Sequence, residues 1–255
     1  MPRLQNKICV ITGASEGLGL EIARAFAAEG AAVVMLARSA DKLQARAAEL
    51  RAAGHRALPI TCDVGRTDQV QAAIAATLAE FGRLDVLVNN AAVAIPGDIT
   101  DQTDADWHAL LNINLLGVFR GIKFVLPAML AQKSGSIINL ASLQGDRSWD
   151  HWTTYAAAKG AMKAMTRQLA GQYGAQGVRF NCISPGAMDT PMNQARRAKE
   201  GEALYEANCR LHALGRMGRA DEVNGAAVFL ASDESSFVTG ADLVVDGGLS
   251  VLTRA

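Results

Sequence analysis

Short apolar segments rich in β-branched residues alternate with longer alanine-rich amphipathic segments along most of the chain. Several of the short segments are apolar at consecutive positions, so both faces of the predicted strands need to be covered. Parallel strands between two layers of helices meet this requirement, whereas strands with one solvated face would alternate apolar and polar residues. The pattern therefore predicts an α/β fold with a doubly wound parallel sheet and helices on both of its faces.

The predicted elements follow one another closely. The predicted strands are Ile8–Thr12, Ala32–Ala37, Ala57–Cys62, Val86–Asn89, Ser136–Leu140, Val178–Ser184 and Leu243–Val245. The predicted helices are Gly19–Glu29, Asp41–Ala53, Asp68–Phe81, Asp104–Met129, Tyr155–Tyr173 and Ala220–Ala231, with Ser39 and Thr67 as N-caps. No repeat or linker divides the chain, so we expect a single domain over residues 1–255. The polar, helix-prone stretch at about 187–214 interrupts the alternation and is predicted to be a substrate lid.

Composition argues against several classes of function. Lys plus Arg equals Asp plus Glu at 25 each, which indicates neither nucleic acid nor an acidic polymer as a partner. The four cysteines are scattered without metal-ligand or redox spacing, so we expect free thiols in a reducing compartment and no metal site. We see no signal sequence and no apolar run approaching the ~18 residues that span a bilayer. The expectation is a soluble cytoplasmic protein that acts on a small molecule, without a membrane partner.

A glycine-rich turn follows the first predicted strand, in the sequence Thr12-Gly13-Ala14-Ser15-Glu16-Gly17-Leu18-Gly19. Glycines at a strand-to-helix turn let the backbone approach a pyrophosphate, whose charge the helix N-terminus stabilises. The spacing is Gly-x3-Gly-x-Gly rather than the more familiar Gly-x-Gly-x-x-Gly. A tight turn alone would also explain the glycines. Their place in the first β–α unit favours a dinucleotide site formed by Gly13, Ser15, Gly17, Leu18 and Gly19.

Two further strand ends are expected to meet at the same site. Asp63 and Val64 end the third predicted strand, where a carboxylate can accept a hydrogen bond from an adenine amino group. Asn90 and Ala91 end the fourth, where small residues leave room for ribose and nicotinamide and the Asn side chain fixes nearby backbone. For either segment alone, a simple turn after a strand is an equally good interpretation.

The end of the second predicted strand bears on the choice between NAD and NADP. An acidic residue there would bind the adenosine ribose hydroxyls and repel a 2′-phosphate, but this chain has Arg38 and Ser39. A guanidinium suits a phosphate dianion, and the serine hydroxyl can donate a further hydrogen bond. Glu16 opposes this interpretation, because NADP enzymes commonly carry a second cation at that position of the loop. We predict NADP in preference to NAD.

Tyr155 and Lys159 stand four residues apart at the start of a predicted helix, so they share one face. An ammonium group about 5 Å from the phenol, at an effective dielectric of ~20, would stabilise the phenolate by ~3 kcal/mol. That is roughly two pKa units, and it would bring the phenol towards the pH at which general acid/base catalysis is effective. A Tyr-x3-Lys pair is common by chance, so its meaning depends on its surroundings.

Two polar residues supply those surroundings. Ser142 follows the fifth predicted strand, at the carboxyl edge where ligands of such sheets bind, and its hydroxyl can hold a substrate oxygen beside Tyr155. Asn114 falls inside a long predicted helix, where a buried amide needs partners. A kink that carries a water molecule towards Lys159 would supply one. Asn112 is the competing residue and is expected to be solvated or at an interface.

Taken together, these motifs resemble the short-chain dehydrogenase/reductase family in its single-domain branch. The matching residues are Thr12-Gly13-x3-Gly17-x-Gly19, Asp63, Asn89-Asn90-Ala91, Asn114, Ser142, Tyr155-x3-Lys159 and Pro185-Gly186-x3-Thr190. They stand in the family's order and at its separations from residue 12 to residue 190, and residues 245–248 look like its usual ending. The resemblance implies a seven-stranded Rossmann fold, an NAD(P) cofactor and usually a homotetramer.

The resemblance also implies a role for each catalytic residue. Tyr155 would be the acid/base, Lys159 would bind the nicotinamide ribose and lower the pKa of Tyr155, and Ser142 would orient the carbonyl. Asn114 would anchor a proton-relay water. The segment from Pro185 and Gly186 to Thr190 would support the nicotinamide. Glu16 departs from the NADP pattern and leaves the prediction of an enzyme unchanged.

The substrate is less sharply constrained by the sequence. The predicted pocket walls are Ala94–Ile95, Leu143–Gly145, Trp149–Trp152, Met188 and Met192, which suggest a hydrophobic or cyclic ketone or secondary alcohol. Within them, His151 fits a surface loop better than a substrate ligand. A 3-oxoacyl-carrier-protein reductase is an alternative, with only Arg120, Lys123 and Lys133 as a basic rim. A non-catalytic NAD(P)-binding regulator is an alternative from another class, and a Rossmann methyltransferase is disfavoured by the glycine spacing.

Overall fold

The computed structural model describes residues 2–252 and is built around one parallel sheet. Its seven strands lie in the order β3-β2-β1-β4-β5-β6-β9, and each adjacent pair is parallel. The strands are β1 (Ile8–Thr12), β2 (Ala32–Ala37), β3 (Ala57–Thr61), β4 (Val86–Asn89), β5 (Gly135–Leu140), β6 (Val178–Pro185) and β9 (Asp242–Val245). The predicted doubly wound seven-stranded Rossmann sheet is confirmed, with the strand order reversing between β1 and β4.

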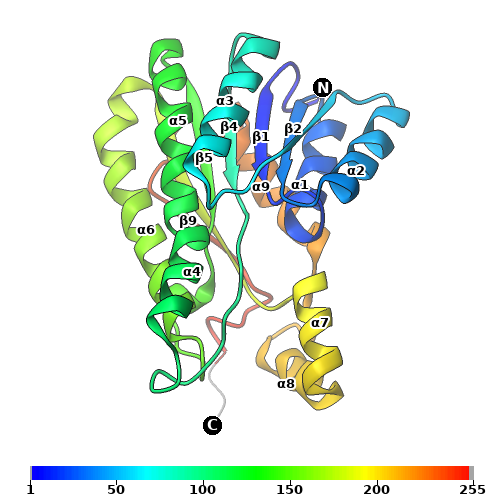
Figure 1. Ribbon diagram of the computed structural model, residues 1–255, viewed down its shortest axis with the longest axis vertical. Coiled ribbons are helices and arrows are strands. Elements are labelled where there is room, and N and C mark those ends of the chain that lie inside the picture. Colours follow the sequence, from blue (N-terminus) through cyan, green and yellow to red (C-terminus); the bar gives the residue numbers. More distant parts are fainter. Residues whose placement is uncertain (1, 253–255) are drawn as a thin grey trace.

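Helices cover both faces of the sheet, as Figure 1 shows. On one face lie α1 (Gly17–Ala28), α2 (Ala40–Ala52) and α9 (Asn224–Ala231). On the other lie α3 (Thr67–Phe81), α5 (Leu116–Gln132) and α6 (Thr153–Tyr173), with α4 (Asp104–Asn114) packed beside α5 and α6. This arrangement leaves the ends of the central strands free to hold a ligand.

The first strand shows why the sheet needs two layers of helices. Cys9 and Ile11 point into the core cluster shared with α1 and α9, whereas Ile8 and Val10 point into the cluster shared with α3 and α5. All four side chains are at most 4% exposed. Since neighbouring side chains of a strand alternate between its faces, a strand that is apolar at every position has to lie between two apolar layers.

Several predicted boundaries differ from those observed. The long predicted helix Asp104–Met129 is two helices, because the backbone at Leu115 leaves helical geometry at φ −120° between α4 and α5. The predicted helix Ala220–Ala231 begins as a 3-10 turn, Ala220–Val223, before α9. Ser39 is the N-cap of α2 as predicted, but Thr67 is the first residue of α3 and Arg66 is its N-cap.

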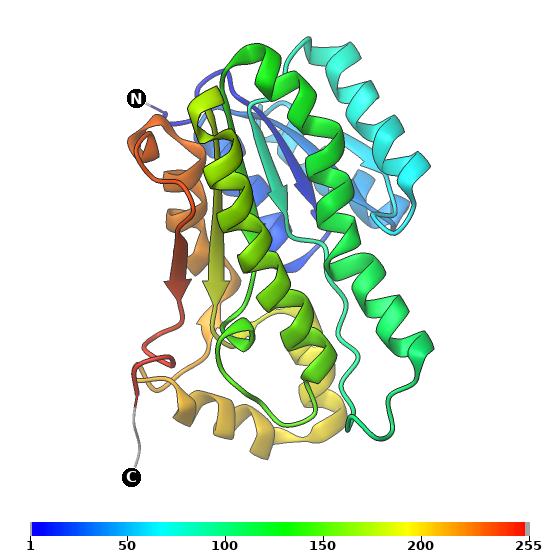
Figure 2. The same ribbon diagram turned by 90° about the vertical axis from the view of Figure 1, so that its left-hand side faces the viewer.

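The stretch predicted as a lid folds into two helices at the carboxyl ends of the strands. These are α7 (Pro191–Glu200) and α8 (Glu202–Leu211), between the short paired strands β7 (Met188–Asp189) and β8 (Gly218–Arg219). Figure 2 shows both helices beyond the tips of the strand arrows, at the end of the molecule opposite the N-terminus. The sheet and this helical pair therefore enclose the edge at which a ligand would bind.

Helices α4 and α5 together form a stretch long and apolar enough to cross a membrane by length and composition, Asp104–Gln132, with a mean hydropathy of 1.5. No such run was predicted from the sequence. In the structure, α5 packs against α3, β4 and β5, and α4 packs against α6. The apolar composition of these helices is accounted for by their place in the layer that covers the sheet.

The glycines in the connection from α6 to β6 offer a test of this packing. Gly177 has φ +85°, and a Cβ there would lie 2.1 Å from the carbonyl oxygen of Lys133. Gly177→Ala should therefore lower the free energy of unfolding by about 2–4 kcal/mol. Gly171→Ala is the matched control, because no atom lies within 4 Å of its added methyl group within α6, and it should raise stability by about 0.5–1 kcal/mol. Urea unfolding of both variants measures the difference, and equal stabilities would contradict the described turn.

Candidate active site

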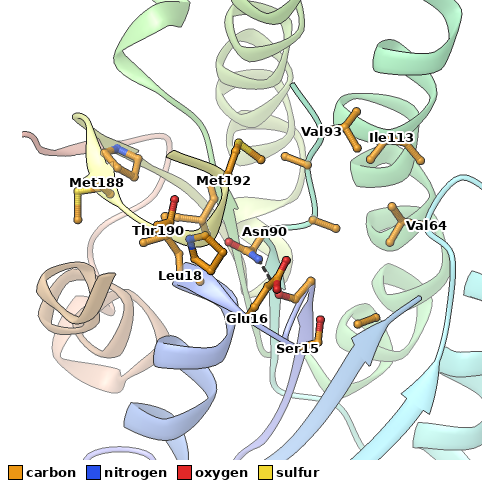
Figure 3. A pocket seen from close by; sticks show the side chains of 18 of the residues that line it. Ser15, Glu16, Leu18, Val64, Asn90, Val93, Ile113, Met188, Thr190 and Met192 are labelled. Atoms are coloured by element: carbon orange, nitrogen blue, oxygen red, sulfur yellow. Dashed lines mark hydrogen bonds between the residues drawn. The ribbon is translucent and has the colours of Figure 1, made fainter. Parts of the chain in front are cut away.

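A cavity of about 300 Å³ opens at the carboxyl ends of β1 and β4, where the strand order reverses. Of the residues predicted to bind cofactor or to catalyse, the cavity is lined by Gly13, Ser15, Gly17, Leu18, Arg38, Ser39, Asp63, Val64, Asn90, Ala91, Ser142, Tyr155, Lys159, Pro185, Gly186 and Thr190. Gly19 and Asn114 do not line it. Figure 3 shows Val64, Val93 and Ile113 on one side of the cavity and Met188, Thr190 and Met192 on the other.

The glycine turn is shaped by close backbone contacts. Gly13 has φ +69°, and a Cβ there would lie 2.7 Å from Nδ2 of Asn90. A Cβ on Gly19 would lie 2.4 Å from the carbonyl oxygen of Gly13, so this glycine permits the turn to close rather than facing the ligand itself. Helix α1 begins at Gly17 without a side-chain cap, which leaves its first N–H groups available to an anion such as a pyrophosphate.

Thr12 and Asn90 join the two strands that flank the cavity. The hydroxyl of Thr12 accepts hydrogen bonds from the backbone N–H groups of Asn90 and Ala91 at 2.9 and 3.0 Å. The Asn90 side chain donates in return to the carbonyl of Thr12 at 2.9 Å. The expectation that this Asn fixes neighbouring backbone is met. The pairing holds the glycine turn against the end of β4.

The end of β2 carries more positive charge than the sequence analysis recognised. Arg38 and Ser39 are exposed and line the cavity, as a 2′-phosphate site requires. Glu16 lies in the same region, but its carboxylate is paired with the Lys42 ammonium at 2.7 Å. Lys42 was missed, although its place three residues after Ser39, in the first turn of α2, was a usable signal. The acidic residue that counted against NADP is thus neutralised by a cation from the next helix.

Asp63 has one carboxylate oxygen committed within its own loop. Its Oδ1 accepts a hydrogen bond from the backbone N–H of Gly65 at 2.8 Å, while its own N–H donates to the side chain of Gln69 at 2.8 Å. These two contacts hold the side chain at the mouth of the cavity, next to Val64. A donor such as an adenine amino group can then meet an acceptor that is already fixed.

Asn114 lies at the break between α4 and α5, and its side chain has backbone partners, while the relay water stays a prediction. The side chain is fully buried at the end of α4. Its Oδ1 accepts from the backbone N–H of Val93, and its Nδ2 donates to the carbonyl of the same residue, both at 2.8 Å. The amide is therefore satisfied by protein backbone, and it fixes Val93, which lines the cavity. Asn112, expected to be solvated or at an interface, is partly buried, and its Oδ1 accepts a hydrogen bond from the guanidinium of Arg120 at 2.7 Å.

Ser142, Tyr155 and Lys159 come together at the other end of the cavity, as predicted. Ser142 is the N-cap of a short 3-10 turn, Leu143–Gly145, and its hydroxyl accepts from the N–H of Gln144 at 3.2 Å. The Lys159 ammonium lies 5.4 Å from the centre of the Tyr155 ring. It donates to the carbonyl oxygen of Leu140, at the end of β5, at 2.5 Å. One strand end and one helix thus supply the whole group.

The pKa of Tyr155 differs in direction from the one predicted from the Tyr-x3-Lys spacing. Burial raises the pKa of Tyr155 to about 12, which the neighbouring Ser142 hydroxyl only partly offsets. Burial also lowers the pKa of Lys159 to about 8. The expected lowering of the phenol pKa by the ammonium is therefore not seen, and burial is the dominant cause of both shifts.

Lys163, one turn beyond Lys159, belongs to a buried ionic network that the sequence analysis missed. The side chain is 3% exposed and contacts the carboxylates of Asp146 and, at 2.8 Å, Asp242. Asp242 also accepts from the hydroxyl of Ser184 at 2.7 Å. Since Asp146 ends the 3-10 turn that begins at Ser142, this network fixes that turn against α6 and β9.

Aromatic and basic residues lie behind Tyr155. The Trp152 ring meets the Tyr155 ring edge-on at 5.4 Å and 79°, and the Arg196 guanidinium of α7 lies 5.2 Å from the centre of the Trp152 ring. His151 is exposed, with φ +69°, and its Nδ1 lies 2.6 Å from Asp98. Of the predicted pocket walls, Met188 and Met192 line the cavity, and Trp152 contacts Tyr155, which lines it. The prediction was wrong for the others, because this cavity is not lined by Ala94–Ile95, Leu143–Gly145 or Trp149–Trp152.

Comparison with known proteins gives a consistent picture. The family model described as enoyl-(acyl carrier protein) reductase matches residues 13–250. The chain is 36% identical to the 3-oxoacyl-acyl-carrier-protein reductase FabG of Thermotoga maritima, over 98% of this chain and 100% of that one. It is 38% identical to 3beta-hydroxysteroid dehydrogenase 1 of Eggerthella lenta, over 97% of this chain and 95% of that one. A crystal structure of a gluconate 5-dehydrogenase from Burkholderia cenocepacia, in complex with NADP and tartrate, is 36% identical with a TM-score of 0.93, covering 99% of each chain.

The ionic network of Lys163 can be tested by removing the charge. Lys163→Met should lower the free energy of unfolding by about 2 kcal/mol, less than for a fully buried pair because both carboxylates keep contact with solvent. Lys123→Met is the matched control at an exposed position of α5 and should change stability by less than about 0.5 kcal/mol. Thermal unfolding monitored by circular dichroism makes the comparison, and equal losses in the two variants would show that the network contributes nothing.

Proposed function

The chain belongs to the short-chain dehydrogenase/reductase family and is an NAD(P)-dependent oxidoreductase acting on CH–OH groups; on this premise we propose that it interconverts a secondary alcohol and a ketone with NADP. The observation that carries the proposal is a single cavity lined at one end by Gly13 and Arg38 and at the other by Ser142, Tyr155 and Lys159. A dinucleotide bound along this cavity would bring its nicotinamide to the catalytic end, where it supplies or accepts a hydride.

The proposed mechanism assigns the proton to Tyr155. In the reducing direction its hydroxyl donates a proton to the substrate oxygen, and in the oxidising direction the phenolate removes one. Ser142 donates a hydrogen bond to the same oxygen and orients it. Lys159, held by the carbonyl of Leu140, places its positive charge beside the ring and its remaining N–H groups towards a ribose. The phenol of Tyr155 carries its proton near neutral pH, so the proton needed in the reducing direction is present, and a bound nicotinamide cation together with the Lys159 ammonium would favour the phenolate needed in the oxidising direction.

The cofactor preference rests on the charges around the end of β2. Arg38 and Ser39 offer a guanidinium and a hydroxyl to a 2′-phosphate, and both border the cavity. Lys42 neutralises Glu16 at 2.7 Å, so the anion that would repel this phosphate is paired. We propose NADP over NAD on this balance, with the remainder of the dinucleotide held by the glycine turn, Asp63, Val64, Asn90 and Ala91.

The substrate side favours an apolar molecule, such as a hydrophobic or cyclic ketone. Met188 is 5% exposed and Met192 is 46% exposed, so the latter presents a flexible apolar surface to an incoming molecule. A carrier-protein substrate is less well supported. Arg120, the first cation considered for such a partner, uses its guanidinium in hydrogen bonds to Thr67, Val64 and Asn112.

We also propose a homotetramer in the cytoplasm. Leu116 and Phe119 on α5 are 45% and 47% exposed, and a second copy packed along this helix would remove both side chains from water. All four cysteines are free thiols, in keeping with a reducing compartment.

Tyr155→Phe tests the chemistry, because it removes only the hydroxyl. Turnover of a panel of cyclic and open-chain ketones and alcohols, followed at the nicotinamide absorbance, should fall by at least ~10³-fold, in line with loss of the general acid. Binding of NADPH, followed by fluorescence, should remain within a few-fold of wild type. Normal turnover in this variant would overturn the mechanism. Tight NADPH binding by the wild type without turnover of any member of the panel would favour the non-catalytic regulator.

Arg38→Asp tests the cofactor assignment. Replacement of the guanidinium by a carboxylate should repel a 2′-phosphate and accept the ribose hydroxyls, so the ratio of kcat/KM for NADPH to that for NADH should fall by ~100-fold or more. Lys42→Met, which frees the carboxylate of Glu16, should lower the same ratio to a smaller extent. Arg24→Met is a control on α1 that lies outside the cavity lining. An unchanged ratio in Arg38→Asp would place the preference elsewhere.

A further inference from the structure

His212 lies behind the turn that would support the nicotinamide. It follows the last residue of α8, is 2% exposed and reaches the turn between β6 and β7 from the side away from the cavity. Its Nε2 accepts a hydrogen bond from the backbone N–H of Ala187 at 3.2 Å. Its Nδ1 lies 2.7 Å from the carbonyl oxygen of Asn208. Neither the catalytic group nor the dinucleotide site described above uses this histidine.

These two contacts define the protonation state of the ring. A backbone N–H can only donate, so Nε2 has to be an unprotonated acceptor. A carbonyl oxygen can only accept, so Nδ1 has to carry the proton. The ring is therefore neutral and in its Nδ1–H tautomer. Protonation of Nε2 would replace the acceptor with a second N–H directed at the N–H of Ala187.

The turn beyond the ring is held by this hydrogen bond together with two backbone hydrogen bonds. Gly186 and Met188 line the cavity on either side of Ala187. The Ala187 carbonyl accepts from Gly218 at 3.0 Å, and the Gly186 N–H donates to Val245 at 3.0 Å. A Cβ on Gly186 would lie 2.9 Å from Nε2 of the ring, so turn and imidazole are in close contact. A displacement of the ring would move the backbone that faces the nicotinamide.

We propose that neutral His212 is a positioning residue that holds the Pro185–Met188 turn in its cofactor-binding form, so that protonation of its Nε2 weakens cofactor binding. The inference rests on the proposed function, because it requires that the turn contact the nicotinamide half of the cofactor. It assigns no contact between His212 and the cofactor or the substrate. The effect is transmitted through the peptide group of Ala187.

The charges around the ring determine the sign of the effect. Asp246, after β9, faces the ring across Gly186, and hydrogen bonds from Ser250 and Gly248 lower its pKa despite the opposing effect of burial. It therefore stays anionic at acid pH and favours a cationic imidazole. Arg216 and Glu222 pair with each other at 2.7 Å, and Asp189 binds Gln194. Cofactor affinity should thus be full where His212 is neutral and should be lower at acid pH, where a protonated Nε2 can no longer accept from Ala187.

The test compares dissociation constants for NADPH, measured by fluorescence at pH 8.0 and 5.5, in wild type, His212→Gln, His212→Leu and His55→Gln. Gln offers an uncharged acceptor to Ala187 at both pH values, whereas Leu removes the acceptor. Because the 2′-phosphate of NADPH itself titrates near pH ~6, the dissociation constant of each variant is compared with that of wild type at the same pH. His55→Gln is the matched control, since this histidine lies between α2 and β3, outside the cavity lining.

Between pH 8.0 and 5.5, the affinity of wild type and of His55→Gln should fall at least about fivefold more than that of His212→Gln. His212→Leu should bind about tenfold more weakly at pH 8.0, as expected for loss of one buried hydrogen bond. Superimposable pH profiles for wild type and His212→Gln would overturn the inference, whether or not His212→Leu folds. Failure of the wild type to bind either NADPH or NADH would overturn the proposed function instead.

Discussion

The hydrogen bonds between Thr12 and the backbone of Asn90 and Ala91 join β1 to the end of β4, where the strand order reverses. The cavity exists because the chain turns to opposite faces of the sheet after these two strands. These hydrogen bonds extend the pairing of β1 with β4 beyond the last paired residues of the two strands and into the glycine turn. The positive φ of Gly13 and the lack of space for a Cβ on Gly19 then fix how closely helix α1 approaches the cavity.

The catalytic end depends on two buried cations on one helix. Lys159 and Lys163 are both 3% exposed, and burial of an ammonium group is costly unless it is paired or hydrogen-bonded. Lys159 meets a backbone carbonyl at the end of β5, whereas Lys163 meets two carboxylates from different elements. The first has its pKa lowered by burial to about 8, while the carboxylates raise the pKa of the second against the opposing effect of burial. Helix α6 thus carries one buried cation beside the catalytic tyrosine, Lys159, and a second, Lys163, whose ion pairs stabilise the surrounding fold.

Local signals in the sequence were enough to predict the strands and most of the cofactor loops. Apolar β-branched runs and glycine turns act within a few neighbouring residues, and the boundaries of β1, β2 and β4 match those predicted. A kink at Asn114 was predicted, but the Val93 backbone partner of its side chain was not, because that partner lies 21 residues earlier in the chain. The network of Lys163 was missed for the same reason, since Asp242 is brought near only when β9 joins the sheet. The raised pKa of Tyr155 depends on burial, which Tyr-x3-Lys spacing does not encode.

The two ends of the cavity differ in whether backbone or side chains form most of their surface. The dinucleotide end is formed largely by backbone, so its requirements appear as glycines and small residues at strand ends. The substrate end is formed by side chains from separate segments, as in the Arg196 guanidinium over the Trp152 ring and the edge-on contact of Trp152 with Tyr155. Substitution there alters the pocket without disturbing the sheet. This division explains why relatives of similar identity to the chain carry names as different as an acyl-carrier-protein reductase and a hydroxysteroid dehydrogenase. In this chain the side chains at that end come from α7, which supplies Met192 to the cavity lining and Arg196 to the Trp152 ring, and from Trp152, which contacts Tyr155.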